Sequence, residues 1–158
     1  TEYPSWLYPV TKGATTIWEH WDGIMENGDF WSADMNSFNH YSYGAIGDWL
    51  YRSAVGIREA APGFKKIVIQ PHPGGGFGHM QAATLTPYGR VAAKWTAEEE
   101  VLKTLEVEIP VNTTAEILVP ASVMEAVKNE NGLKPVGYEA GYVKYLVGSG
   151  HYFFAVLP

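Results

Sequence analysis

Residues 104–109 read TLEVEI, with an apolar side chain at every second position. Side chains alternate between the two faces of a β-strand, so Leu105, Val107 and Ile109 are expected to face inward and their polar neighbours outward. A strand with one apolar face has to be covered by a second layer of structure. This stretch therefore predicts a sheet that packs against another sheet.

Similar segments recur from residue 64 onward, separated by short runs of Pro, Gly, Asn and Thr that form turns. About seven short strands at this spacing indicate an antiparallel β-sandwich. The run of three glutamates at 98–100 is expected to be a solvated turn or edge. The predicted strands are residues 66–70, 79–86, 89–98, 103–109, 115–119, a segment near 142–147, and 152–157.

The first 60 residues have a different composition, rich in Trp, Gly, His and Asn. Apolar positions from Phe38 to Ile57 recur at steps of three and four, which predicts one amphipathic helix. Asn36 or Ser37 is expected to cap its start, and Pro62-Gly63 to end it. Glycines inside a helix are unfavourable, so close packing against other backbone is expected at three positions, Gly44, Gly47 and Gly56.

The two halves together predict an α+β chain. An N-terminal helical segment, residues 1–61, is expected to precede the antiparallel β-sandwich, residues 62–158. A single helix cannot bury the aromatic side chains of the first half, so further partners are expected upstream. The chain starts at Thr1 and shows no signal peptide, so we expect a segment of a longer protein.

Composition excludes several classes of function. The chain has 158 residues, of which 46% are hydrophobic and 18% charged, which is typical of a globular protein. A net charge of −6 disfavours nucleic acid and acidic membranes as partners, and no apolar run approaches the ~20 residues of a membrane span. The absence of cysteine excludes disulfides and thiol catalysis, and leaves a cytoplasmic, periplasmic or secreted location open.

The motif that bears most directly on chemistry is GATTIWEHWDG at residues 13–23. It sets Glu19 between Trp18 and Trp21, and Asp22 follows three residues later. Tryptophan faces bind the apolar side of sugar rings, and carboxylates serve as acids or bases in glycoside cleavage. Five of the six tryptophans lie within the first 49 residues, which favours a ring-binding site, although a large aromatic core would produce the same clustering.

Each polar side chain of this region also has an ordinary structural interpretation. From composition alone, an N-cap or a surface carboxylate beside two core indoles is favoured for Glu19 over a catalytic role. Asp22 precedes Gly23, and Asp-Gly is a strong turn signal, so a turn-forming role is favoured over a sugar contact. His40 lies in the expected first turn of the helix, where a structural histidine is the usual interpretation.

The aromatic side chains are expected to divide between the site and the core. Trp18 or Trp21 is expected near the site, whereas the core is expected to hold Trp6, Trp31 and Trp49. No metal ion and no cofactor is expected, because His72 and His79 flank a glycine-rich loop without a carboxylate at ligand spacing.

Six motifs occur in one order: SWLYP at 5–9, GATTIWE at 13–19, WDG at 21–23, SFNHY at 37–41, GAIGDWL at 44–50 and PGF at 62–64. In this order they closely resemble the end of the catalytic barrel of bacterial α-L-rhamnosidases, an inverting glycoside hydrolase family. The β half resembles the family more weakly, through Ile69-Gln70-Pro71 and the hairpin around Tyr88-Gly89.

The resemblance implies an (α/α)₆ barrel followed by a small β-sandwich, with residues 1–61 as the last part of the barrel. It implies that Glu19 is the general base that deprotonates the attacking water, and that His40 contacts the sugar. Sugar contacts are also expected from Trp18, Trp21 and Asp22. The general acid is expected on an upstream segment that the chain does not contain.

It follows that the parent protein is expected to release terminal α-L-rhamnose, with inversion, from a glycoside or polysaccharide. The chain alone is expected to be inactive, and its exposed aromatic surface to favour self-association. Two alternatives remain for the sandwich: a carbohydrate-binding module without catalysis, or a structural domain that stabilises the barrel's end.

Overall fold

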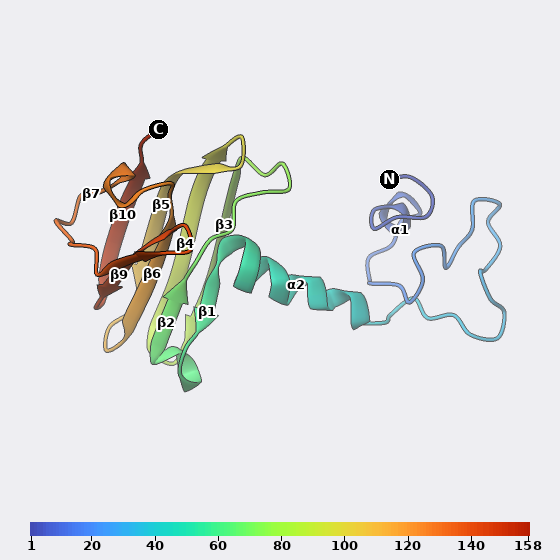
Figure 1. The fold of residues 1–158 in the computed structure, drawn as a ribbon. Helices are drawn as coiled ribbons and strands as arrows, with labels where there is room; N and C mark the ends of the chain where they lie inside the picture. Colours follow the sequence, from blue (N-terminus) through green and yellow to red (C-terminus); the bar gives the residue numbers. More distant parts are fainter. The chain divides into compact units, whose positions relative to one another are not determined.

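The computed structural model describes residues 1–158, which form two compact units, Thr1–Asp48 and Trp49–Pro158. Figure 1 draws the second unit as two facing sheets, whereas most of the first unit is loop. None of the helices is both long and apolar enough to cross a lipid bilayer.

The helical part of the chain is shorter than its sequence pattern predicts. Besides α1 (Tyr8–Thr11), it consists of a 3₁₀ turn η1 (Ser42–Ala45), α2 (Ile46–Trp49) and a π-helical segment η2 (Leu50–Val55). The expected start at residue 36 or 37 is wrong, because the backbone of residues 37–40 is hydrogen-bonded to residues 17–19 instead. His40 therefore precedes the helix and does not lie in its first turn.

The expected end of the helix at Pro62-Gly63 is also wrong. The helix stops at Gly56, which has φ +91°, and Pro62–Phe64 forms a separate 3₁₀ turn, η3. A Cβ on Gly56 would lie 2.2 Å from the carbonyl carbon of Gln70, so only glycine fits here. Close packing is confirmed at Gly56, outside the helix, and wrong at Gly47, whose Cβ would meet nothing within 4 Å.

Two five-stranded sheets build the second unit, with strand orders β1-β2-β6-β9-β8 and β3-β4-β5-β10-β7. Every pairing is antiparallel except β2 with β6, which is parallel. The predicted antiparallel sandwich is thus confirmed as the architecture, with one parallel pair added. The strands are β1 (Ile57–Glu59), β2 (Lys66–Ile69), β3 (His79–Thr86), β4 (Gly89–Glu98), β5 (Val101–Ile109), β6 (Thr114–Pro120), β7 (Val127–Asn129), β8 (Gly137–Glu139), β9 (Tyr142–Val147) and β10 (Gly150–Val156), with a 3₁₀ turn η4 (Met124–Ala126) before β7.

The seven predicted strands correspond to β2, β3, β4, β5, β6, β9 and β10, with bounds shifted by at most two residues. The three missed strands, β1, β7 and β8, have three residues each, too few to show an alternating pattern. Glu99 and Glu100 form the turn between β4 and β5, and all three glutamates are exposed, as expected.

The core of the second unit lies between the two sheets. Leu105, Val107 and Ile109 are buried, as the alternation predicts. The Tyr145 ring of β9 lies 4.9 Å from the Phe154 ring of β10, so the two sheets meet directly there. Trp95 is fully buried, and its Nε1 donates a hydrogen bond of 3.0 Å to the carbonyl oxygen of Ala54. The indole therefore ties the end of the helical segment to the sandwich.

The predicted domain division at residues 61 and 62 lies between two paired strands. β1 pairs with β2 through Ile57↔Ile69 and Glu59↔Ile67, so sheet structure begins before the predicted boundary. By packing, the described chain divides at Asp48 and Trp49. The division at 61/62 stays a prediction about the longer protein.

Candidate catalytic site

The segments that carry Glu19 and His40 lie side by side in the first unit. The backbone N–H of Glu19 donates to the carbonyl of Ser37 at 2.8 Å, and that of His40 donates to the carbonyl of Ile17 at 2.8 Å. The hydroxyl of Thr16 also donates to the carbonyl of Phe38. Two motifs that are well separated in the sequence are thereby brought together by backbone hydrogen bonds.

Trp18, which precedes Glu19, is a packing residue within its unit. Its side chain is only 6% exposed, and its ring meets the Phe38 ring edge-on at 5.0 Å. The same two segments are therefore joined by an aromatic contact as well as by backbone hydrogen bonds. Trp18 fixes the backbone on which Glu19 stands and does not present a free face to a ligand.

Trp21 lies in an aromatic cluster with Trp6 and Tyr43. Its ring centroid is 5.8 Å from that of Trp6 and 5.7 Å from that of Tyr43. Its Nε1 is buried and makes no hydrogen bond within the chain. A buried indole N–H normally has a partner, so this group is available to an acceptor from outside the chain.

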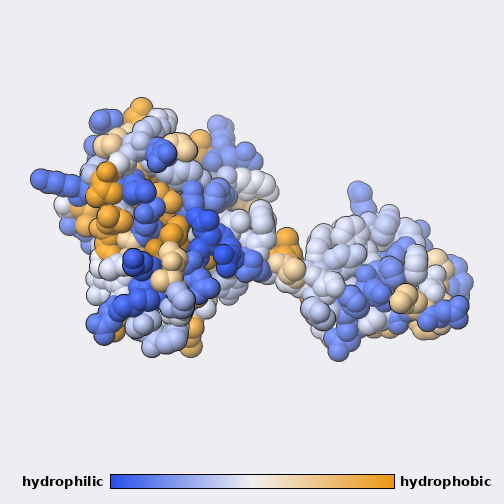
Figure 2. Space-filling view, turned by 60° about the horizontal axis from the view of Figure 1, so that its bottom comes forward, coloured by the Kyte–Doolittle hydropathy of each residue, from blue (hydrophilic) through white to orange (hydrophobic).

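Three tryptophans expected in the core are instead about half exposed: Trp6 at 46%, Trp31 at 48% and Trp49 at 51%. Trp49 begins the second unit, and for Trp6 and Trp31 the physical reason is the small size of the first unit. Its only buried residues are Tyr8, Pro9, Trp18 and Gly23, which cannot cover so many large rings. In the view of Figure 2 this unit is mostly blue and white.

Asp22 lies in a tight turn, as the Asp-Gly pair predicts. The N–H of Gly23 donates to the carbonyl of His20 at 3.1 Å, which closes the turn. Asp22 Oδ2 accepts a hydrogen bond of 3.2 Å from the hydroxyl of Tyr3. Burial raises the pKa of Tyr3, and the neighbouring Asp22 carboxylate raises it further. The Asp22 carboxylate is thus already engaged within the unit.

Asn36 holds the turn at Asp22-Gly23 against the segment that carries His40. The sequence pattern did not reveal this role. Asn36 Nδ2 donates to the carbonyl of Gly23 at 2.9 Å. A Cβ on Gly23 would lie 3.1 Å from Asn36 Oδ1 and 3.2 Å from the Phe38 ring, so a larger residue would push these two side chains slightly outward. No local pattern signals this pairing, because the partners are thirteen residues apart without regular structure between them.

His40 carries a further unpartnered polar atom of the site, besides Trp21 Nε1 and Asn36 Oδ1. Its Nδ1 is buried without a hydrogen-bond partner, and its ring is nearly parallel to that of Tyr41, at 6.1 Å. A neutral imidazole can donate from one ring nitrogen and accept at the other. His40 can therefore bind a hydroxyl beside the segment that carries Glu19.

No three His, Cys, Asp or Glu side chains come together as metal ligands in the chain. His72, one of the two histidines near the glycine-rich loop, is engaged in the second unit: its Nδ1 lies 2.9 Å from the carbonyl oxygen of Ser53. What the site offers chemically is therefore one carboxylate, one imidazole and an indole N–H.

Two family models match consecutive parts of the chain. Residues 1–54 match the bacterial alpha-L-rhamnosidase 6 hairpin glycosidase domain. Residues 56–134 match the bacterial alpha-L-rhamnosidase C-terminal domain.

Curated relatives match over nearly the whole chain. The chain is 40% identical to an alpha-L-rhamnosidase of Streptomyces avermitilis in a match that covers 98% of the chain. It is 43% identical to an alpha-L-rhamnosidase of Formosa agariphila in a match that covers 96% of the chain. The chain spans only 15% and 17% of the lengths of these two relatives.

A solved structure, Streptomyces avermitilis alpha-L-rhamnosidase complexed with L-rhamnose, is 39% identical with a TM-score of 0.87. The match covers 98% of this chain and 15% of the solved chain.

Proposed function

Because the chain belongs to the bacterial α-L-rhamnosidase family, we propose that it is the C-terminal part of a glycoside hydrolase that releases terminal α-L-rhamnose from glycosides or polysaccharides. Residues 1–61 would complete its helical barrel, and residues 62–158 would form an accessory sandwich. The sandwich has a complete core of its own, which supports a structural role at the end of the barrel.

In this proposal Glu19 is the general base. Inverting hydrolysis uses two carboxyl groups about 6.5–9.5 Å apart, with a water molecule between one of them and the sugar. Glu19 takes a proton from that water molecule while the oxygen of the water attacks the anomeric carbon. An acid from an upstream segment protonates the departing glycosidic oxygen. The configuration at the anomeric carbon is inverted because attack and departure occur on opposite faces.

His40 and Trp21 are the proposed sugar contacts. Each has a buried polar atom without a partner in the chain, His40 Nδ1 and Trp21 Nε1, and sugar hydroxyls can satisfy both. Asp22 and Trp18 are proposed to support the site without touching the sugar. Trp18 packs beneath the Glu19 segment, and Asp22 holds the turn that follows it through Tyr3.

The observation that carries the proposal is the pair of backbone hydrogen bonds between residues 17–19 and 37–40. It brings the proposed base and the proposed sugar ligand onto adjacent segments, as a shared site requires. The same two segments contain two of the motifs that resemble the family.

The proposal is tested by Glu19→Gln in the full-length enzyme. The amide keeps the shape of the side chain but cannot accept the water's proton, so kcat should fall by roughly 10²–10⁴-fold. The matched control is Glu26→Gln, an exposed carboxylate of the same unit that should leave kcat unchanged. NMR of the first-formed rhamnose should show the inverted anomer. Near-normal turnover of Glu19→Gln, or a retained anomer, contradicts the proposed mechanism.

The chain alone should neither hydrolyse an aryl α-L-rhamnoside nor remain strictly monomeric. One carboxylate of a pair cannot assemble the reaction, and half-exposed indoles such as Trp6 and Trp31 favour association between copies. Sedimentation velocity over a concentration series measures the association. Detectable cleavage by the chain alone would refute the assignment of the acid to another segment.

A further inference from the structure

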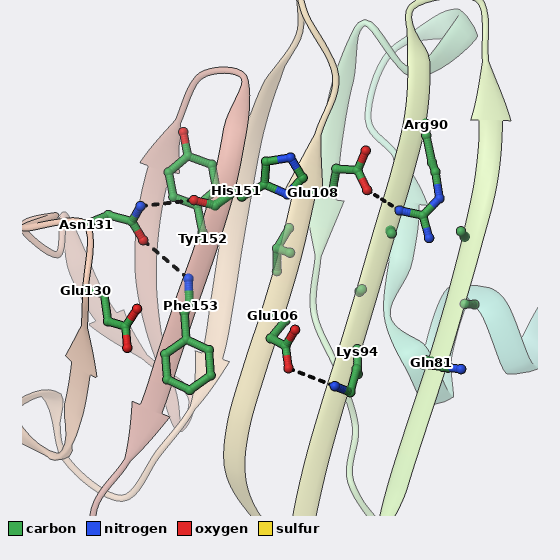
Figure 3. Close-up of a pocket in the computed structure, with 15 residues that line it drawn as sticks. Gln81, Arg90, Lys94, Glu106, Glu108, Glu130, Asn131, His151, Tyr152 and Phe153 are labelled. Atoms are coloured by element: carbon green, nitrogen blue, oxygen red, sulfur yellow. Dashed lines mark hydrogen bonds and ion pairs between the residues drawn. The ribbon is translucent and has the colours of Figure 1, made fainter.

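The outer face of the sheet β3-β4-β5-β10-β7 contains a hollow of about 610 Å³ that the proposed catalysis does not use (Figure 3). Small-molecule sites in proteins have volumes of roughly 300–1,000 Å³. The opposite face of this sheet packs into the sandwich core, so the side chains of the hollow are those that the strand alternation turns outward. The hollow lies entirely within the second unit.

A strip of small side chains forms the floor of the hollow. Ala83 of β3 pairs with Ala92 of β4, so two methyl groups lie next to each other on adjacent strands. Arg90 and Lys94 are outward-facing positions of β4 on either side of Ala92, and their long side chains rise above it. Figure 3 shows these two basic side chains separated along the strand, with only short side chains between them.

Two acidic side chains of β5 interact with the basic ones: Glu106 is opposite Lys94 in the strand pairing, and Glu108, opposite Ala92, reaches Arg90 diagonally. Arg90 is paired with Glu108, and Lys94 Nζ lies 2.9 Å from Glu106 Oε1. Each pair places hydrogen-bond donors next to acceptors, which is what neighbouring sugar hydroxyls need, since each hydroxyl both donates and accepts. The four charges of the two pairs cancel, and Glu130, which also lines the hollow, leaves it with one net negative charge that disfavours an anionic ligand.

The far side of the hollow is formed by β10 and the loop after β7. Phe153 lies opposite Glu106 in the pairing of β10 with β5, and His151 lies opposite Glu108. Asn131 fastens the loop to this edge, because its Nδ2 donates to the carbonyl of His151 at 3.0 Å and its Oδ1 accepts from the N–H of Phe153 at 3.3 Å. The half-buried Phe153 ring provides an apolar face beside the polar pairs.

We propose that this face binds a neutral oligosaccharide. The ring of Phe153 and the alanine strip contact the apolar faces of the sugar units, while the two ion pairs bind hydroxyls on either side. Nucleic acid does not fit, because the basic side chains are already neutralised by Glu106 and Glu108. The site is separate from the Glu19 segment and does not depend on the catalytic role proposed for it.

The proposal is tested by NMR titration of the ¹⁵N-labelled chain of residues 1–158 with rutinose, cellotetraose and digalacturonate. A neutral probe should produce saturable shifts of the His151 and Phe153 amides, and anionic digalacturonate should produce none. Ala92→Gln, which fills the strip, should abolish these shifts. Phe153→Ala should weaken binding about tenfold or more, the equivalent of losing about 1.4 kcal/mol.

A matched control exists on the other sheet. Glu116 of β6 pairs with Lys144 of β9 at 3.0 Å, an outward-facing ion pair like those of the hollow. Glu116→Gln should leave binding unchanged, whereas Glu108→Gln should weaken it. Thermal unfolding of each variant checks that the fold persists, since the substituted side chains lie outside the core.

Three results overturn the proposal: no saturable shift with either neutral probe, unchanged binding by Ala92→Gln, or binding of digalacturonate alone. Glu19→Gln in the same chain separates the two proposals, because it should bind like the unmodified chain. If Glu19 proves not to be the general base, oligosaccharide binding at the hollow is unaffected. If the hollow binds no oligosaccharide, the role proposed for Glu19 is unaffected.

Discussion

The two units of the chain solve the burial of apolar side chains differently. Trp49–Pro158 closes two sheets over a common core and leaves Trp95, Leu105 and Phe154 without exposed surface. Thr1–Asp48 buries little beyond Tyr8 and Trp18 and exposes most of its rings. The unit with the complete core carries no proposed catalytic group, and the unit with the candidate base depends on few internal contacts. If Glu19 acts as proposed, its segment has to take its rigidity from further polypeptide that packs around it.

Amide hydrogen exchange should show the largest difference between the units. Amides of β4 and β5, paired on both sides, should exchange at least about 10³-fold more slowly than those of residues 12–41, because their exchange requires opening of the sandwich. Mass spectrometry of peptic peptides measures both regions at once. Equal protection would mean that the first unit is as stable as the second.

Substitution of one tryptophan in each unit should show the next largest difference, in the free energy of unfolding. Trp95→Ala removes a fully buried indole and its hydrogen bond to Ala54, and should lower the free energy of unfolding of the sandwich by about 3–5 kcal/mol. Trp6→Ala, at a side chain 46% exposed, should change it by less than about 0.5 kcal/mol. Urea unfolding followed by circular dichroism compares them. Similar losses would contradict the division into two units.

Two glycines, one within the helical segment and one directly after it, should respond to substitution with opposite signs. Gly56→Ala combines φ +91° with a clash against the Gln70 backbone and should destabilise the chain by about 3 kcal/mol. Gly47→Ala meets open space inside α2 and should stabilise that helix by about 0.5–1 kcal/mol. Thermal unfolding detects both changes. A neutral Gly56→Ala would show that the backbone there can move apart.

The smallest effect is expected at alkaline pH. Burial raises the pKa of Tyr145 above 10, and a contact with Asn129 only partly offsets it. Because the folded state disfavours the phenolate, the contribution of Tyr145 is complete below pH 10 and is lost as pH rises through the raised pKa. Tyr145→Phe should reduce the slope of unfolding free energy against pH by up to about 1.4 kcal/mol per unit there.

The control for this titration is Tyr41→Phe, at a ring 87% exposed in the first unit. This substitution should not change the slope of the sandwich's unfolding free energy against pH in the alkaline range. Denaturant midpoints between pH 9 and 11 give the comparison. An unchanged slope in Tyr145→Phe would mean that another group controls alkaline unfolding.

How much could be predicted differed along the chain for a physical reason. The buried face of a strand appears in the sequence as apolar residues at every second position, so six residues were enough to predict β5. The three-residue strands β1, β7 and β8 are defined by their partners rather than by their own pattern. The helix was overextended because the apolar spacing around Phe38 suits a helix, while residues 37–40 are held instead by backbone hydrogen bonds to residues 17–19.

The sequence by itself determined the sandwich, its main strands, the family and the candidate base, because periodicity and motif order are local properties of the chain. Only the tertiary structure decided which groups meet. The approach of His40 to the Glu19 segment, the contact of Gly56 with Gln70 and the sugar-sized hollow over Ala83 and Ala92 all depend on pairings between distant residues. Such pairings are selected by the free energy of the whole fold, and no short stretch of sequence encodes them.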